Sequence, residues 1–163
     1  MPIRTFEPGY YHIYNRGFEK MTIFKNMSDF ERFYKLVLKY LSSPKYAGIK
    51  ILAYSFLPNH FHCVVSTSGI EISSFFGDLQ NAYGKYFNIK YERKGQLFEG
   101  RFRARFIQDE EYLAQCLSYV NFNAVKHRIV ENIDDYPWTS YHQITDKDKI
   151  EKHRDLILDE LEL

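Results

Sequence analysis

Cysteine is scarce in this chain of 163 residues, because only Cys63 and Cys116 are present and they form no CxxC pair. A disulfide framework or a structural zinc site is therefore not expected. Long hydrophobic runs are also missing: the longest stretch of low polarity, residues 51–58, falls far short of the about 20 residues that span a bilayer. The first six residues lack the apolar segment of a signal peptide. These absences predict a cytoplasmic protein with no membrane partner.

An excess of charge of either sign is absent as well. The 22 lysines and arginines balance 21 acidic residues, for a net charge of +1. Binding of a polyanion through overall charge is excluded, so a basic surface must come from uneven placement. Residues 84–106 supply this, with seven basic and two acidic side chains, whereas residues 143–163 carry four basic and seven acidic ones.

The composition is that of a folded domain with a substantial core. Apolar residues make up 45% of the chain and aromatic residues 18%, including 14 tyrosines and 14 phenylalanines. This content excludes a disordered chain, and the length predicts one domain. We assign residues 1–145 to that domain and residues 146–163 to a charged C-terminal helix or tail.

Hydrophobic periodicity predicts seven elements before the tail. Strands are expected at residues 10–14, 49–57, 60–67 and 96–107, and helices at residues 28–41, 72–89 and 109–123 or 127. The order strand, helix, strand, strand, helix, strand, helix suits an α+β ferredoxin-like antiparallel sheet with its helices packed on one face. The open face of that sheet could then carry a site, and a helical extension would follow at residues 147–163.

The basic residues of the last strand repeat with a period of two. Arg101, Arg103 and Arg105 fall on one face of a strand, with apolar residues between them. Such a row matches a phosphate backbone, with tyrosines nearby for base stacking. A solvated outer face whose arginines cover the sheet is an equally good interpretation of this feature alone.

His60 and His62 are the first candidate for chemistry. Two residues apart on a strand, they point to the same face, while Phe61 points to the other and Cys63 joins it as a buried small residue. Their imidazoles could converge on one divalent ion. By itself an HxH pair is a weak motif, and two exposed histidines without a ligand would look the same.

Tyr119 is the second candidate. It lies on the third helix with Gln115 and Asn123 one turn to either side and Lys126 two turns on, flanking an apolar stripe. A tyrosine at the edge of the core is the common alternative, and it fits Tyr112. A positioned tyrosine can attack a phosphodiester when a cation neutralises the phosphate charge. Its phenol has an ordinary pKa of about 10, so it needs a base or a metal-polarised phosphate.

Five segments together resemble motifs of single-tyrosine transposases of the histidine-hydrophobic-histidine (HUH) class, and in particular of REP-associated tyrosine transposases. The resemblance extends from about residue 10 to residue 141, in the family's order. The segments are YHIYNRG at 11–17, PNHFH at 58–62, GQLFEGRF at 95–102, SYVNFNAVK at 118–126 and YPWTSY at 136–141.

The resemblance implies an enzyme that cleaves and rejoins single-stranded DNA beside a small hairpin. It implies Mg²⁺ or Mn²⁺ held by His60, His62 and Asn123, and Tyr119 as the nucleophile that forms a 5′-phosphotyrosine. We expect DNA contacts from the basic residues of the middle segment and of the tyrosine helix. These are Arg93, Lys94, Arg101, Arg103, Arg105 and Lys126.

One departure from the family pattern affects the expected geometry. The proline that normally follows the asparagine is Ala124 here, so we expect the helix to continue past Asn123. Three functions stay open: the transposase, mobile or domesticated; a non-catalytic hairpin-binding module of the same fold; and a metal phosphodiesterase that uses water. A homodimer is compatible with the family, and the protein would act at the bacterial nucleoid.

Overall fold

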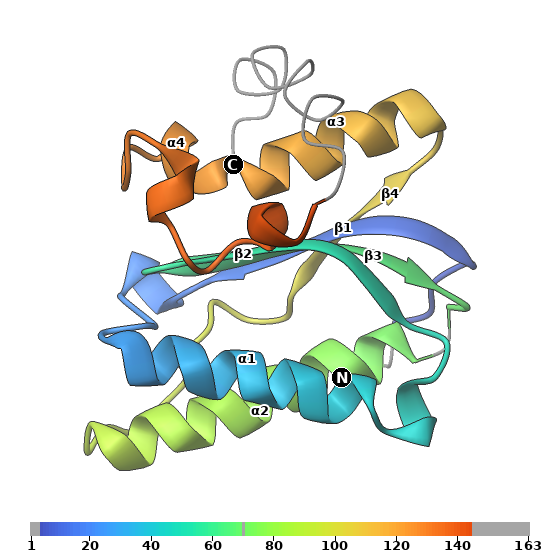
Figure 1. Cartoon of the computed structure of the whole chain (residues 1–163). Helices are drawn as coiled ribbons and strands as arrows, with labels where there is room; N and C mark the ends of the chain where they lie inside the picture. Colours follow the sequence, from blue (N-terminus) through green and yellow to red (C-terminus); the bar gives the residue numbers. More distant parts are fainter. Residues whose placement is uncertain (1–3, 70, 145–163) are drawn as a thin grey trace.

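The computed structural model describes residues 4–69 and 71–144 as an antiparallel sheet between two helical layers (Figure 1). The strand order is β2-β3-β1-β4, so β4 forms one edge and β1 lies between two partners. The strands are β1 (Gly9–Arg16), β2 (Lys50–Leu57), β3 (His60–Thr67) and β4 (Arg103–Ile107). The prediction of an α+β fold with an antiparallel sheet is confirmed.

The helices lie on both faces of the sheet. α1 (Met27–Leu41) and α2 (Ile72–Lys90) pack under one face, and α3 (Glu110–Asn121) with the short α4 (Asn123–Lys126) covers the other (Figure 1). Short 3₁₀ turns join these elements at Phe18–Lys20, Pro44–Tyr46, Ile133–Asp135 and Ser140–Gln143. None of the helices in the part of the chain that the structure describes is long and apolar enough to cross a membrane.

The expectation that all helices share one face is wrong for α3. Val120 and Cys116 of α3 pack on Ala53 of β2 and Val64 of β3, which point away from α1 and α2. An apolar sheet face must be covered, so α3 fills the side that the sequence interpretation left open. The candidate site consequently lies between a strand and a helix rather than on an exposed sheet.

The larger core lies between the sheet and the pair α1 and α2. Aromatic residues dominate it: Phe33 of α1 contacts Phe56, Phe61 and Tyr83, with ring centroids 4.9–5.3 Å apart. Alternate residues of β3 point into this layer, including Phe61, Cys63 and Val65. Cys63 is buried as predicted.

The last predicted strand is much shorter than expected. Only its second half, Arg103–Ile107, pairs with β1, where Tyr14 faces Arg103 and His12 faces Arg105. Gly95 and Gly100 have φ angles of +92° and +72°, which bend the chain in a way that glycine permits. Between them Phe98 makes only an isolated bridge with Gly17, so residues 96–102 form a loop.

The start of α1 holds a buried carboxylate. Asn26 caps the helix, and the side chain of Asp29 has no exposed surface. Asp29 accepts hydrogen bonds from Lys90 Nζ (2.8 Å) and from the hydroxyls of Tyr86 (2.8 Å) and Tyr91 (2.6 Å). Burial raises the pKa of Asp29, but these donors outweigh it and the net pKa is lowered. The carboxylate therefore fastens α1 to α2.

We expect Asp29→Asn to lower the free energy of unfolding by about 2 kcal/mol at pH 7, because charge-assisted hydrogen bonds are lost. The lowered pKa of Asp29 means that this stabilisation is present above the unfolded value of about 3.9 and disappears as the pH falls through the folded value. Urea unfolding at pH 7 and pH 3 measures both effects. Glu31→Gln, on the exposed face of α1, is the control. An equal loss at both pH values would contradict the assignment.

Candidate active site

The α3-facing side of β3 presents both candidate histidines. β3 begins at His60, and His60, His62 and Val64 alternate with the core residues on the other face. The imidazole rings of His60 and His62 have centroids 5.0 Å apart. The prediction that the pair shares one face is confirmed, but His62 is buried rather than exposed.

His62 is held by a third histidine that the sequence interpretation did not single out. His12 Nε2 of β1 lies 3.0 Å from His62 Nδ1, and both side chains are buried. Burial and the nearby Arg105 lower the pKa of His12 to about 3, and burial next to His12 takes the pKa of His62 well below its ordinary value. Both rings are neutral at pH 7. In the hydrogen bond between them, one of the two nitrogens therefore carries the proton and the other accepts it.

The remaining nitrogen of His62 has no partner. His62 Nε2 is fully buried and makes no hydrogen bond. If His62 Nδ1 donates to His12, Nε2 carries a lone pair that points away from β1. A buried polar atom without a partner is costly in a protein interior and therefore calls for an explanation such as an ion.

His60 contacts two asparagines. Its Nδ1 lies 2.6 Å from Asn59 Oδ1, and its Nε2 lies 3.2 Å from Asn123 Oδ1. The other end of the Asn59 amide donates to the Lys20 carbonyl, which fixes the direction of that amide and makes His60 Nδ1 the donor. Burial, with the nearby His127, lowers the pKa of His60 to about 4. The lone pair of a neutral His60 Nε2 thus faces Asn123.

Tyr119 contacts this cluster from α3. Its ring centroid is 5.7 Å from that of His62 and 5.9 Å from that of His12. The side chain is 0% exposed and its hydroxyl is buried without a hydrogen-bond partner. Burial raises the pKa of Tyr119, against the effects of Asn123 and Arg105, which lower it. Lys126 Nζ lies 5.1 Å from the centre of the ring.

The expectation that the helix continues past Asn123 is wrong. α3 ends at Asn121, Phe122 leaves helical geometry at φ −99° and ψ 10°, and α4 begins at Asn123. Phe122 packs on Tyr141 with ring centroids 5.1 Å apart, in a cluster with Leu57, Ala124, Ile133 and Tyr136. This packing ends the helix without a proline and places Asn123 against His60.

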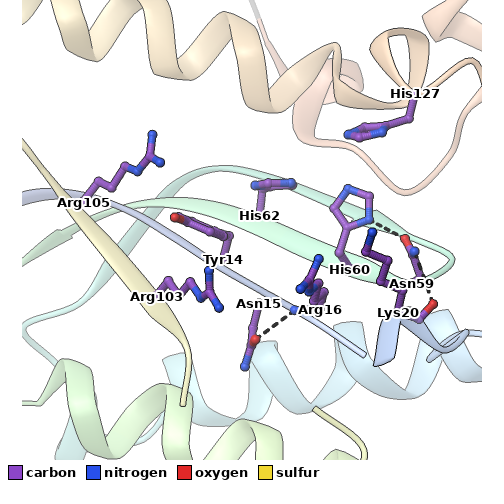
Figure 2. Close-up of a pocket in the computed structure, with 10 residues that line it drawn as sticks. All are labelled: Tyr14, Asn15, Arg16, Lys20, Asn59, His60, His62, Arg103, Arg105 and His127. Carbon is purple, nitrogen blue, oxygen red and sulfur yellow. Dashed lines mark hydrogen bonds between the residues drawn. The ribbon is translucent and has the colours of Figure 1, made fainter. Parts of the chain in front are cut away.

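A cavity of about 470 Å³ opens beside the histidines. Tyr14 and Arg103 lie on neighbouring strands here, and Arg105 reaches toward Tyr14 with its guanidinium 5.8 Å from the ring centre (Figure 2). Of the predicted residues, the cavity brings together His60, His62, Arg103 and Arg105. Lining residues without a predicted role are Tyr14, Asn15, Arg16, Lys20, Asn59 and His127.

Four predicted DNA-binding residues lie outside this cavity, and one of them, Lys126, is next to the lining residue His127. Arg93 donates to Asn88 Oδ1 (2.7 Å) and the Gln96 carbonyl (3.2 Å), so it stabilises the loop after α2. Lys94 follows it and is exposed. Arg101 precedes β4 and lines a second cavity, so it does not continue the row of Arg103 and Arg105.

The donor atoms present fit a hard divalent cation completed by other oxygen ligands. Within the described ranges, no group of three or more His, Cys, Asp or Glu residues could hold a metal ion. The site instead combines two imidazoles with the Asn123 amide and the Tyr119 hydroxyl. His62 Nε2 and the Tyr119 hydroxyl are buried without partners, and the lone pair of His60 Nε2 meets the Asn123 amide oxygen. A shared positive ion would satisfy these lone pairs.

The sequence family follows from a comparison with known proteins. The family model described as "Transposase IS200 like" matches residues 5–123, well over half of the chain. The chain belongs to this family. The matched span includes His60, His62, Tyr119 and Asn123, so all four residues of the cluster lie within the IS200-like transposase region.

Two relatives add detail to the IS200-like assignment. A Haemophilus influenzae protein described as a REP-associated tyrosine transposase is 39% identical over 54 residues, which cover 33% of this chain and 30% of that protein. The match thus spans less than a third of that relative. A solved structure of a REP-associated tyrosine transposase bound to a REP hairpin superposes with a TM-score of 0.68 and 18% identity, over 88% of this chain and 82% of that one. This likeness supports the fold.

His12 is the most informative residue that sequence reasoning missed in this IS200-like transposase. It belongs to the segment YHIYNRG, yet a single histidine on a strand gives no sign of its partner. The signal is the register: β1 and β3 pair antiparallel with Tyr14 opposite His62, which places His12 diagonally across from His62. That register becomes visible only once the strands are paired.

In the protein free of divalent metal, we expect the ring resonances of His60 and His12 to titrate with midpoints near pH 4 and pH 3. Both values are lower than the about 6.5 of an unfolded histidine, so the unfolded chain takes up protons first. Stability should therefore increase with pH between about 4 and 6.5. Nuclear magnetic resonance titration and urea unfolding measure these two effects. Midpoints near 6.5 would show that the histidines are solvated.

Proposed function

We propose that this IS200-like transposase is a metal-dependent single-strand DNA endonuclease and strand transferase with Tyr119 as its nucleophile. The observation that carries the proposal is the convergence of two buried groups without partners, His62 Nε2 and the Tyr119 hydroxyl, with the lone pair of His60 Nε2 and the Asn123 amide oxygen, beside a cavity lined with arginines. A core that served stability alone would have little use for such groups.

In the proposed reaction, the Tyr119 oxygen attacks the phosphorus of a phosphodiester. A bond forms between that oxygen and phosphorus, the bond from phosphorus to the 3′ oxygen breaks, and the phenolic proton leaves to water. The 3′ oxygen takes up a proton and departs as a hydroxyl, while the 5′ end stays linked to Tyr119. Because the phosphotyrosine retains the ester bond, a second 3′-hydroxyl can reverse the step and join strands.

His60, His62 and Asn123 are the residues that would hold Mg²⁺ or Mn²⁺. When bound, such an ion would neutralise charge on the scissile phosphate. His12 would orient His62 by accepting its Nδ1 proton, which keeps the Nε2 lone pair directed at the site. Arg103 and Arg105 would contact neighbouring phosphates from β4.

The burial of Tyr119 adds a requirement to this proposal. The hydroxyl lies behind His62 rather than on the cavity wall, so the side chain must rotate or α3 must shift before the oxygen reaches a phosphate. The break at Phe122 separates α3 from α4. The four proposed residues lie close together in one chain, and the proposal is compatible with a monomer or a homodimer.

A hairpin in DNA is the substrate that the relatives favour. The solved structural neighbour is described as bound to a REP hairpin, and we propose a hairpin with adjoining single strand for this chain. Whether the protein mobilises its own gene or acts as a domesticated enzyme, the chemical step would be the same.

We expect Tyr119→Phe to abolish a covalent adduct with DNA and leave binding within about twofold, because only the attacking oxygen is removed. The test incubates purified protein with labelled hairpin oligonucleotides from DNA flanking its own gene, with Mn²⁺, Mg²⁺ or chelator, followed by a denaturing gel. Tyr112→Phe on the same helix is the matched control. Cleavage without a protein-linked band would assign water as the nucleophile, and binding with neither product would favour the non-catalytic module.

We expect His12→Leu to weaken Mn²⁺ binding by about tenfold to 100-fold, the effect of losing a partner behind a metal-bound histidine. His12→Gln should restore most of the affinity, because its amide oxygen can accept the His62 Nδ1 proton. Electron paramagnetic resonance of free Mn²⁺ measures affinity without any activity assay. Equal loss in both variants would indicate that His12 acts through packing alone.

A further inference from the structure

A second cavity lies on the other side of the wall formed by Asn15, Gln80 and Gly100. It has a volume of about 390 Å³ and is bounded by the first half of α2 and the residues just before β4. Asn15 Nδ2 donates to Gln80 Oε1 (2.8 Å) and to the Gly100 carbonyl (3.0 Å). Asn15 lines the first cavity, whereas Gln80 and Gly100 line the second. The two cavities are therefore neighbours.

Two guanidinium groups of like charge belong to the second cavity. Arg4 lies over the ring of Phe102 at 4.1 Å from its centre, and Ser73 Oγ donates to the Arg4 carbonyl (2.6 Å). The ring contact positions the Arg4 side chain, and the hydrogen bond positions its backbone, before any ligand arrives. Burial, and then the charge of Arg101, lowers the pKa of Arg4. Like charges held together at a cavity favour the binding of an anion.

The other polar groups of the cavity leave room for that anion. Ser73, Ser74, Gln80 and Asn81 supply neutral hydrogen-bonding groups. Asp78 is the acidic residue of the lining. Its carboxylate accepts hydrogen bonds from Lys45 Nζ (3.2 Å) and from the Tyr46 hydroxyl. Gly77 contributes no side chain, and a Cβ built there meets nothing within 4 Å.

The edge strand connects the two cavities. β4 has a partner on one side only, and Arg103 of the first cavity is two residues from Arg101 of the second, at most about 7 Å along the chain. The same edge exposes Phe106, which is 55% accessible and could stack with a base. A DNA strand that leaves the first cavity and crosses β4 would pass directly to the second cavity.

We propose that the cavity between Arg4, Arg101 and α2 is a second binding subsite for the phosphate backbone of single-stranded DNA. It would hold the part of the DNA strand that extends beyond the scissile phosphate, after the DNA has crossed the edge of β4. The inference rests on the proposed function for the identity of the polyanion, but it concerns residues that take no part in the chemistry.

Gly77 offers a direct test. Gly77→Glu would place a negative charge in the cavity, and Gly77→Gln would add nearly the same volume without charge; the open space at this position allows both to fold. The probes are a hairpin alone and the same hairpin with a single-stranded extension on its 5′ or 3′ side. Fluorescence anisotropy gives the affinities, and circular dichroism checks the fold of each variant.

We expect Gly77→Glu to weaken binding of at least one extended probe about fivefold relative to Gly77→Gln, the factor for one unit charge near 4 Å in water. The hairpin alone should bind both variants equally. Arg4→Met, which keeps the stem over Phe102, should reduce the slope of log affinity against log salt by about 0.7 for the same extended probe, as for one lost contact to a single strand.

The proposed subsite is refuted if Gly77→Glu and Gly77→Gln bind every extended probe with the same affinity. It is also refuted if Gly77→Glu weakens binding of the hairpin alone as much as binding of the extended probe. Adduct formation by the wild-type protein keeps this result separate from the proposed function. A wild-type adduct with no effect at Gly77 refutes only the subsite. Charge-dependent binding of an extended probe without any adduct supports the subsite and refutes the tyrosine chemistry.

Discussion

The alternation of side chains along β3 determines both which residues enter the core and which residues form the candidate site. Phe61, Cys63 and Val65 point toward α1 and α2, while His60, His62 and Val64 point toward α3. A shift of one residue in register would exchange these sets and bury the histidines among phenylalanines. The cross-strand pairing of His62 with Tyr14 fixes this register, and with it the position of His12 next to His62.

Burial between the sheet and α3 gives the site its electrostatic character. The same low-polarity surroundings keep His12, His60 and His62 neutral and raise the pKa of Tyr119. Neutral imidazoles have the lone pairs that metal ligation needs. A phenol that stays protonated, by contrast, is a weak nucleophile. Cationic side chains surround this neutral centre, with Arg103 and Arg105 on β4 and Lys126 over the tyrosine ring. The arrangement places positive charge around the cavity and close to the neutral imidazoles, whose pKa values it helps to lower.

The sequence predicted those parts of the molecule that depend on local periodicity. The strand at residues 60–67 and the helix at 72–89 agree with β3 and α2 to within a residue, because alternation and helical spacing are strong there. The strand predicted at 96–107 is confirmed only at Arg103–Ile107, because Gly100, with a φ of +72°, bends the chain inside the alternating pattern. The predicted end of α3 was wrong because Phe122 packs on Tyr141, which is distant in sequence, and this contact ends the helix although the proline is missing. His12 was missed for a similar reason, since its role arises only from strand pairing.

The central position of β1 has a consequence for how such a protein can diverge. β1 pairs with β3 and β4 along its length, contributes Tyr11 and Ile13 to the core, and presents His12 and Tyr14 beside the site. Selection on stability and selection on chemistry thus act on alternate residues of one strand, so this segment can accept few replacements. Exposed residues at the free edge of β4, such as Phe106, are less constrained in this way. Replacements at such exposed positions would disturb neither the core nor the histidine pair.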